Sequence, residues 1–292
     1  MCDKIIDAHV HLWEQQHGMV NGKPVIGIGG GRSSFGGEIR QMLPAYMEDD
    51  KNTVERLISN MDYAGVSGCV VTQEYIDGNQ DDYLLSAKEK YNNRLKICSL
   101  YEENEDWRLE GFDGVKICAS RLQDKNLIKL LPVFQKVEQA GKFISIDLSD
   151  GEEQVEDMQY LIQACPNLRI AIGHFGMVTR PGWQKQIELA CNKNVYIESG
   201  GLTWLFHKEF YPYPSAIHAI MVAKDICGIN KLMWGSDYPR TMTAITYRMS
   251  IDFILRSDKL TKQEKAALFG DNAFAFYGFN DLPKPEQIPD ML

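Results

Sequence analysis

Eight short apolar segments, separated by amphipathic stretches, constrain the fold of this chain more than any other feature of its sequence. Most are continuous apolar runs, which are typical of parallel strands buried on both faces. Eight is the number of strands that closes a (β/α)₈ barrel, and strand–helix alternation repeated eight times favours a barrel over an open doubly wound sheet. The predicted strands are residues 4–9, 68–73, 95–100, 113–118, 142–148, 168–173, 194–199 and 231–236.

Helix boundaries between these strands are marked by recognisable residues. Gly65 follows the first amphipathic segment, where a left-handed residue commonly ends a helix. Pro166 stops another helix at the residue before it. Near the C-terminus, Thr261 and Glu264 have the spacing of a capping box. The 292 residues contain no internal repeat, low-complexity tract or linker, so they predict one domain, residues 1–292.

The charge balance limits the classes of partner. There are 31 basic and 40 acidic residues, a net charge of −9. Nucleic acid and anionic lipid are bound by clustered Lys and Arg, so neither is expected as a partner. A small-molecule substrate remains compatible, because a local basic pocket can lie within an acidic protein. The sequence leaves the oligomeric state open, a homo-oligomer included.

The cysteines and the apolar runs indicate the compartment. The cysteine number is odd, and no C-x-x-C pair is present, which favours reduced thiols over a disulfide or zinc framework. No leader precedes His11, and no run approaches the ~20 apolar residues of a membrane span. We therefore expect a cytoplasmic protein. The seven cysteines are Cys2, Cys69, Cys98, Cys118, Cys165, Cys191 and Cys227.

One long segment interrupts the alternation. Between the first predicted strand and the first predicted helix lie about 40 residues with a glycine-rich stretch at 27–37. The stretch lacks the Gly-Lys-Ser/Thr of a Walker loop and the spacing of a dinucleotide fingerprint. Loops this long in compact domains are usually functional, so we expect a lid or substrate-binding loop; an inert insertion is the alternative.

The first strand ends in Asp7-Ala8-His9-Val10-His11. Residues two apart on a strand point to the same side, so both imidazoles project together. At the C-terminal end of a barrel strand they face the active-site mouth, where two such nitrogens can bind one divalent ion. By itself the motif is equally compatible with two polar residues at a strand end.

Two further polar residues end apolar strands. His174 follows the sixth strand between glycines, and Asp237 follows the eighth, which adjoins the first strand in a closed barrel. A carboxylate there can bind a metal or accept a proton from a nucleophilic water. Taken singly, His174 could be structural and Asp237 a helix cap. Together with His9 and His11 they fall at the same end of one barrel and predict an active site.

The residues at these strand ends resemble those of a known superfamily. The chain resembles the amidohydrolase superfamily, in particular the amidohydrolase 2 branch of barrel-fold metal-dependent hydrolases. The resemblance spans almost the whole chain in the right order. The segments that carry it are Asp-Ala-His-Val-His-Leu-Trp at 7–13, Gly-Val-Lys at 114–116, Gly-His-Phe-Gly at 173–176, Trp-Gly-Ser-Asp-Tyr-Pro at 234–239 and Gly-Asp-Asn-Ala-Phe-Ala-Phe-Tyr at 270–277.

The resemblance implies a site with one divalent metal, Zn or Mn. His9, His11 and Asp237 would line it with His174 alongside, and Asp237 would activate the attacking water. Many relatives carry a histidine ligand at the end of strand five, where this chain has Asp147. Asp147 can bind a hard ion such as Mn²⁺; alternatively the site holds no metal, as in a lactonase relative that also lacks that histidine.

Relatives in this branch open lactones, and others decarboxylate or isomerise. We therefore expect a hydrolase that opens a lactone of a small sugar acid or a carboxylated cyclic ester, with water deprotonated by Asp237. The alternatives are a non-oxidative decarboxylase, a lactone isomerase or a non-catalytic relative. Each candidate for holding the substrate could instead be an exposed charge or a packing residue: Lys116, Arg180, Arg240, Glu74, Tyr75 and Trp204.

Overall fold

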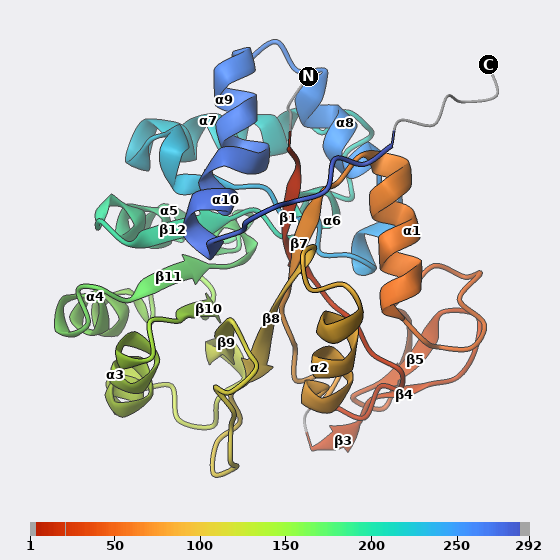
Figure 1. Ribbon diagram of the computed structural model, residues 1–292, viewed down its shortest axis with the longest axis horizontal. Coiled ribbons are helices and arrows are strands. Elements are labelled where there is room, and N and C mark those ends of the chain that lie inside the picture. Colours follow the sequence, from red (N-terminus) through yellow and green to blue (C-terminus); the bar gives the residue numbers. More distant parts are fainter. Residues whose placement is uncertain (1–3, 21, 287–292) are drawn as a thin grey trace.

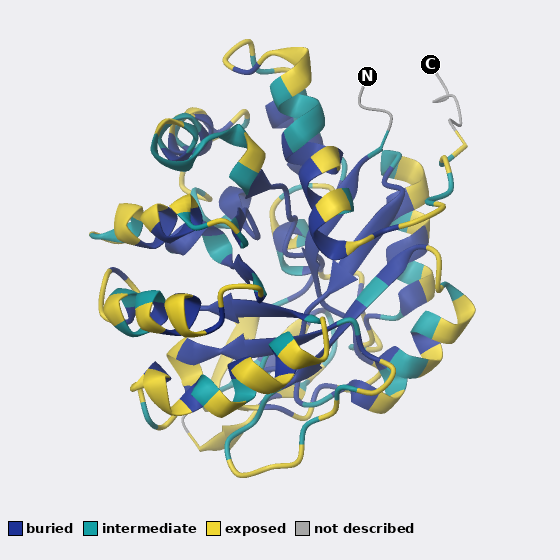
Figure 2. Ribbon diagram, turned by 60° about the vertical axis from the view of Figure 1, so that its left-hand side comes forward, coloured by how far each residue is buried: buried dark blue, intermediate teal, exposed yellow. Residues whose placement is uncertain are grey.

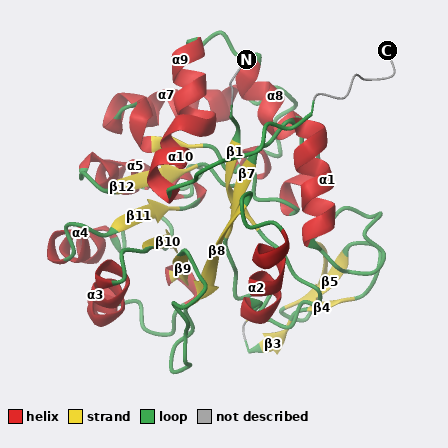
Figure 3. Ribbon diagram, viewed as in Figure 1, coloured by secondary structure: helices red, strands yellow, loops and turns green. Residues whose placement is uncertain are grey.

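Eight parallel strands form one sheet, and each pairs with the strand of this sheet that follows it in the sequence. The structure, a computed structural model, describes residues 4–20 and 22–286. All eight predicted strands are present, with bounds that differ from the prediction by up to three residues at either end, and the barrel prediction is confirmed (Figures 1 and 3). The strands are β1 (Ile6–Val10), β7 (Gly68–Val71), β8 (Leu95–Leu100), β9 (Gly114–Cys118), β10 (Phe143–Asp147), β11 (Arg169–Ile172), β12 (Val195–Glu198) and β13 (Leu232–Met233).

Backbone hydrogen bonds between the first and last strands close the barrel. The amide of Ala8 donates to the carbonyl of Trp234 over 2.9 Å, and the amide of Asp237 donates to the carbonyl of His9 over 2.9 Å. His9 and Asp237, the predicted site residues of the first and last strands, are therefore linked by backbone hydrogen bonds. Closure places them side by side although more than 200 residues separate them.

Helices cover the outer face of the barrel, with their exposed sides turned outwards and the strands buried at the centre (Figure 2). The helix-end signals hold: Gly65 adopts φ 76° at the end of the first helix, and both halves of the Thr261–Glu264 capping box form. The helices are α1 (Val54–Ala64), α2 (Asp81–Lys90), α3 (Leu131–Gln139), α4 (Val155–Ala164), α5 (Trp183–Glu188), α6 (Leu202–Leu205), α7 (Pro214–Cys227), α8 (Met249–Leu255), α9 (Lys262–Ala266) and α10 (Asn272–Tyr277).

The expected alternation fails at one connection. Residues 101–113, between β8 and β9, contain no helix. The segment is short and acidic, with Gly111 at φ 82°, and it lacks an apolar stripe that a helix could bury against the barrel. A coil connection satisfies the barrel geometry there, so eight strands do not require eight covering helices.

A small cluster of apolar side chains fills the barrel interior and closes one end. Interior residues such as Ile6, Ala8 and Phe143 pack with Phe276 and Tyr277 from the C-terminal helix α10. The rings of Phe143 and Tyr277 lie 4.9 Å apart edge to face. Because Ile6 and Phe143 begin their strands, α10 plugs the N-terminal end of the barrel and leaves the C-terminal end open for a site.

The predicted 40-residue loop contains short antiparallel strands. β5 pairs with both β4 and β6 in a three-stranded sheet, and β2 pairs with β3. In Figure 1 this insertion lies below α1 and partly beside, partly below α2. Regular pairing satisfies the backbone polar groups that an irregular loop of this length would leave to solvent. The strands of the insertion are β2 (Met19–Val20), β3 (Lys23–Pro24), β4 (Ile26–Gly27), β5 (Arg32–Phe35) and β6 (Glu38–Gln41).

The described cysteines are free thiols, as predicted, and Cys2 lies outside the described residues. Four are buried, whereas Cys191 is exposed and Cys227 is half-buried. Among the helices of residues 4–20 and 22–286, none combines the length and the apolarity that crossing a membrane requires.

Candidate active site

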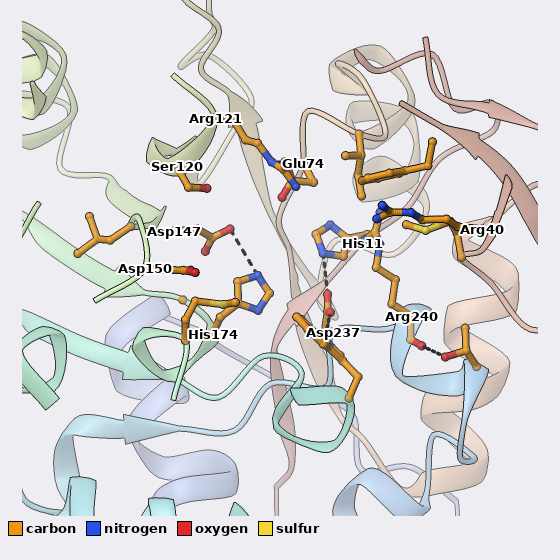
Figure 4. A pocket seen from close by; sticks show the side chains of 18 of the residues that line it. His11, Arg40, Glu74, Ser120, Arg121, Asp147, Asp150, His174, Asp237 and Arg240 are labelled. Carbon is orange, nitrogen blue, oxygen red and sulfur yellow. Dashed lines mark hydrogen bonds and ion pairs between the residues drawn. The ribbon is translucent and has the colours of Figure 1, made fainter. Parts of the chain in front are cut away.

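A cavity of about 560 Å³ opens at the C-terminal ends of the barrel strands. Figure 4 shows Asp147 and His174 on one side of it and His11, Asp237 and Arg240 on the other. Seven of the predicted site residues line it: His11, Glu74, Asp147, His174, Trp204, Asp237 and Arg240. The insertion adds Phe35, Arg40, Gln41 and Met42 to the lining, and its role as a substrate-binding segment stays a prediction.

A β-bulge turns His9 towards this site. The pairing of β1 with β7 shifts register between Asp7 and Val10. Ala8 packs in the barrel interior, so in a regular strand His9 would face outwards with Asp7. An extra residue in a strand re-aims the side chains that follow it. The bulge therefore brings His9 and His11 into the mouth together, with their Nε2 atoms 3.1 Å apart.

The orientation of His9 is set by Glu198 at the end of β12. Oε1 of this fully buried carboxylate lies 2.7 Å from Nδ1 of His9. Glu198 also accepts the backbone N–H groups of His174 and Gly200, at 3.2 and 2.6 Å. An ionised carboxylate only accepts hydrogen bonds. Nδ1 of His9 must therefore carry the proton, and in the neutral ring Nε2 presents its lone pair towards His11.

Asp237 is held from two sides. Its Oδ1 lies 2.9 Å from Nε2 of His11, and its Oδ2 accepts the indole N–H of Trp204 at 2.5 Å. Burial favours the neutral acid, but the hydrogen bond from His11 and nearby positive charge outweigh it and keep the pKa of Asp237 below its usual range. Burial, helped by the charge of Arg240, lowers the pKa of His11 to about 3, so that ring is neutral.

A second group faces this one across the cavity. The fully buried Lys116 on β9 places its Nζ 2.6 Å from Oδ2 of Asp147, which lies 3.6 Å from Nε2 of His174. Nδ1 of His174 lies 3.0 Å from the carbonyl of Gly200, an acceptor, so it carries a proton. Burial opposes a charge on His174, but Asp147 outweighs it and raises the pKa to about 10.

Two residues of the site adopt a left-handed backbone conformation. His174 has φ 52° and Asp237 has φ 60°. Non-glycine residues rarely adopt this region, although Asn, Asp and His do so more often than others. Each strand therefore ends in a sharp turn that points a polar side chain into the mouth, and such conformations persist where the surrounding contacts fix them.

Three predicted substrate-binding residues lie away from the cavity wall. Lys116 is buried and its ammonium contacts Asp147. Arg180 is mostly exposed and pairs with Asp150 at 3.1 Å. Tyr75 donates its hydroxyl to the carbonyl of Tyr101 at 2.9 Å. In each case another residue of the protein contacts the polar group that the sequence analysis predicted to bind a substrate.

Sequence reasoning missed other site residues. The sequence did indicate Glu198, because it is a charged residue at the end of an apolar strand. Asp237 has a similar position after another apolar strand. Arg40 and Arg121 line the cavity and the sequence did not indicate them, because they lie in the insertion and in the turn after β9. Arg121 lies 3.7 Å from Glu74, while Arg40 pairs with Glu38 at 2.9 Å.

The donor set fits a divalent metal. One ligand atom from each of His9, His11 and Asp237 lies within 4.8 Å of the others, and all three residues are buried. The Nε2 atoms of His9 and His11 lie 3.1 Å apart beside Oδ1 of Asp237, so a cation bound there would replace the proton that His11 donates to this carboxylate. A carboxylate bound to the far nitrogen of a metal-binding histidine is the usual outer partner in such sites. Neutral imidazoles and an ionised carboxylate are the forms that bind metal.

A family model described as Amidohydrolase matches residues 6–279. The chain belongs to the amidohydrolase family. No curated protein matches it in sequence. The match over nearly all of its length assigns this amidohydrolase to the family, and the contacts between its side chains define the site.

Solved structures share the fold of this amidohydrolase. An amidohydrolase from Burkholderia multivorans with bound zinc is 16% identical, with TM-score 0.70, over 95% of this chain and 100% of that one. A candidate 2-pyrone-4,6-dicarboxylic acid hydrolase from Pseudomonas putida is 20% identical, with TM-score 0.68, over 97% and 100%. A 5-carboxyvanillate decarboxylase from Novosphingobium aromaticivorans, complexed with manganese, is 18% identical, with TM-score 0.55, over 76% and 79%. These neighbours are thus named for a hydrolase and a decarboxylase as well as for an amidohydrolase.

Proposed function

We propose that this amidohydrolase opens a lactone ring of a small carboxylated substrate, with a water molecule that Asp237 deprotonates. The observation that carries the proposal is the pairing of two opposite groups across one cavity. An ionised carboxylate, Asp237, lies on one side, and a proton-bearing imidazole, His174, lies on the other. Hydrolysis of an ester needs both a proton acceptor for water and a donor to the oxygen that gains charge.

Each step can be assigned to a side chain. Asp237 accepts a proton from water as its oxygen attacks the ring carbonyl, while Trp204 and His11 hold the carboxylate in place. His174 donates to the oxygen that becomes negative, and then protonates the ring oxygen as the C–O bond breaks. The product is a hydroxy acid, and one proton is released at neutral pH.

His9, His11 and Asp237 would hold a divalent ion, Zn or Mn. When bound, such an ion lowers the pKa of water to about 7 and polarises a carbonyl. The metals named for the Burkholderia and Novosphingobium structures support this assignment. Glu198 keeps the His9 ring in the orientation and tautomer that the site needs.

The cavity suits an acidic substrate. Arg40, Arg121 and Arg240 all line it, and a guanidinium pairs in two-point fashion with a carboxylate. Arg240 is bound to the buried Asp77 at 2.7 Å. The pair of Arg40 with Glu38 is exposed to solvent and Arg121 lies 3.7 Å from Glu74, so these two arginines can exchange their partners for a substrate more readily. The acid named for the Pseudomonas protein is in keeping with this class.

Turnover of a lactone panel tests the proposal. Sugar-acid lactones and carboxylated pyrones would be incubated with metal-free and with Mn²⁺- or Zn²⁺-loaded protein, and proton release would be followed with an indicator. One proton and one hydroxy acid per turnover, without gas, support the hydrolase. Release of CO₂ would instead establish the decarboxylase alternative, and a changed lactone without net proton release would establish an isomerase.

A further inference from the structure

The acidic and imidazole groups of the site form two overlapping sets that could each hold an ion. His9 belongs to both: one set adds His11 and Asp237, and the other adds Asp147 and His174. A third set in the described residues also depends on Asp147, together with Glu74 and Cys118. The geometry alone therefore allows one ion or two, and the contacts around His9 and Asp147 decide between them.

His9 can complete only one of its two sets. Its Nδ1 is committed to Glu198 at 2.7 Å, in a fully buried contact. One lone pair remains, on Nε2, which lies 3.1 Å from Nε2 of His11 and 3.8 Å from Oδ1 of Asp237. An ion on the side of His11 and Asp237 thus takes the only free donor of His9, and the other set is left with two members.

Asp147 already has a cation beside it. The ammonium of Lys116 lies 2.6 Å from Oδ2, and the Lys116 side chain is wholly buried. Lys116 lies on the neighbouring strand β9, where it pairs in register with Ser145 of β10. A divalent ion at Asp147 would lie against this ammonium inside the barrel, where water screens charge repulsion poorly.

One nitrogen of His174 is committed in the same way. One of its nitrogens donates to the carbonyl of Gly200 at 3.0 Å, and the other lies 3.6 Å from Oδ2 of Asp147. Oδ1 of Asp147 has no hydrogen-bond partner among the described residues, but the ammonium of Lys116 balances the charge of this carboxylate. No ion is needed there to neutralise Asp147.

We propose that the Lys116 ammonium takes the place of a second metal ion in this site. The protein then binds one divalent ion per chain, through His9, His11 and Asp237, and Asp147 and His174 are not ligands. This inference rests on the metal site of the proposed function and narrows the five ligands predicted from sequence to three. It assigns Lys116 a positioning role: its charge holds Asp147 against His174 and excludes a further cation.

Metal counting tests this without any substrate. Metal-free protein would be dialysed against MnCl₂, and bound manganese measured by elemental analysis and by electron paramagnetic resonance. The expected result is one ion per chain, unchanged in a large excess of MnCl₂. The double variant Lys116→Met/Asp147→Asn removes both charges together, which buried pairs tolerate better than loss of one partner. It should still bind one ion, with affinity within about threefold of the wild type.

Two single variants complete the test. Lys116→Met frees Asp147 for the set that it forms with Glu74 and Cys118, which does not need His9, so a second Mn²⁺ should bind, and coupling between two ions should appear in the resonance spectrum. Asp237→Asn removes a ligand, so affinity should fall at least about 100-fold, beyond the usual effect of an outer partner. Circular dichroism melting of each variant shows whether it is folded, and the double variant carries the test if Lys116→Met does not fold.

Several outcomes would overturn the proposal. Two ions in the wild type, loss of the ion in the double variant, no ion in the wild type, or a single ion in folded Lys116→Met each contradicts it. The ion count needs no turnover. A chain that binds one ion but opens no lactone would refute the proposed reaction and leave this inference standing.

Discussion

Glu198 and His9 face each other across the buried mouth of the barrel, with Oε1 2.7 Å from Nδ1. They lie 189 residues apart in the chain, on the seventh and first strands of the barrel. The contact decides which nitrogen of His9 faces His11 and Asp237, and so which chemistry the ring can perform.

Glu198→Gln tests this contact. An amide can donate as well as accept, so the His9 tautomer is no longer fixed, and Mn²⁺ affinity should fall about 10- to 100-fold. Titration of metal-free protein with MnCl₂ measures the affinity. Glu188→Gln, which makes the same change on the exposed side of α5, should bind like the wild type. Equal affinity in both variants would show that Glu198 does not orient the site.

Asp237→Asn should lower turnover of an accepted lactone by at least about 100-fold, because general base catalysis contributes roughly 10²- to 10⁴-fold. Asn suits this position because it tolerates φ 60°, where a residue such as Val would be strained. Steady-state kinetics measure the loss, with Asp258→Asn on the exposed surface as the control. A folded Asp237→Asn with near-wild-type turnover would refute the mechanism.

Trp204→Phe removes the hydrogen bond to Oδ2 of Asp237 and keeps an aromatic ring in the cavity wall. The carboxylate is then free to turn, so kcat should fall about 10-fold, near the lower end for a bond to a charged group, while KM changes little. Trp107→Phe, at a residue that does not line the cavity, is the matched control. A rise in KM with unchanged kcat would indicate that Trp204 only contacts substrate.

Histidine protonation can be followed directly by ¹⁵N NMR of metal-free protein, because the chain has six histidines. The pKa of His174 is raised to about 10, so its ring should be charged at pH 7; the pKa of His11 is lowered to about 3, so its ring should be neutral there. Asp147→Asn should bring the His174 transition to lower pH. A neutral His174 in the wild type at pH 7 would contradict its role as proton donor.

Asp7 predicts a pH dependence of stability. Its carboxyl accepts the amides of Ser236 and His9 and the hydroxyl of Tyr247, and burial raises its pKa from 3.8 to about 6. The folded state therefore holds a proton that the unfolded chain has lost between about pH 4 and pH 6. The contribution of Asp7 to the free energy of unfolding is present at low pH and falls as pH rises.

Asp7→Asn mimics the protonated acid and should remove this dependence. The free energy of unfolding of the variant, relative to the wild type, should increase by up to ~3 kcal/mol between about pH 4 and pH 7. Urea unfolding at several pH values measures it. A constant difference across that range would mean that Asp7 titrates normally in the folded protein.

The barrel could be predicted because its signals are local. Apolar runs report burial on both faces of a strand, and Gly65 and Thr261 report helix ends through their own backbone preferences. The coil between β8 and β9 and the sheet within the insertion were missed for the opposite reason. Both depend on what the segment packs against, and a local pattern does not record that.

The sequence by itself determined the family of folds and the polar residues that end the strands, His9, His11, His174 and Asp237. Only the tertiary structure decided what each of them does. Closure of the barrel brings Glu198 to His9, and the pairing of neighbouring strands brings Lys116 to Asp147. A proton or an ion responds to charges and dipoles within a few ångströms, and those neighbours come from distant parts of the chain.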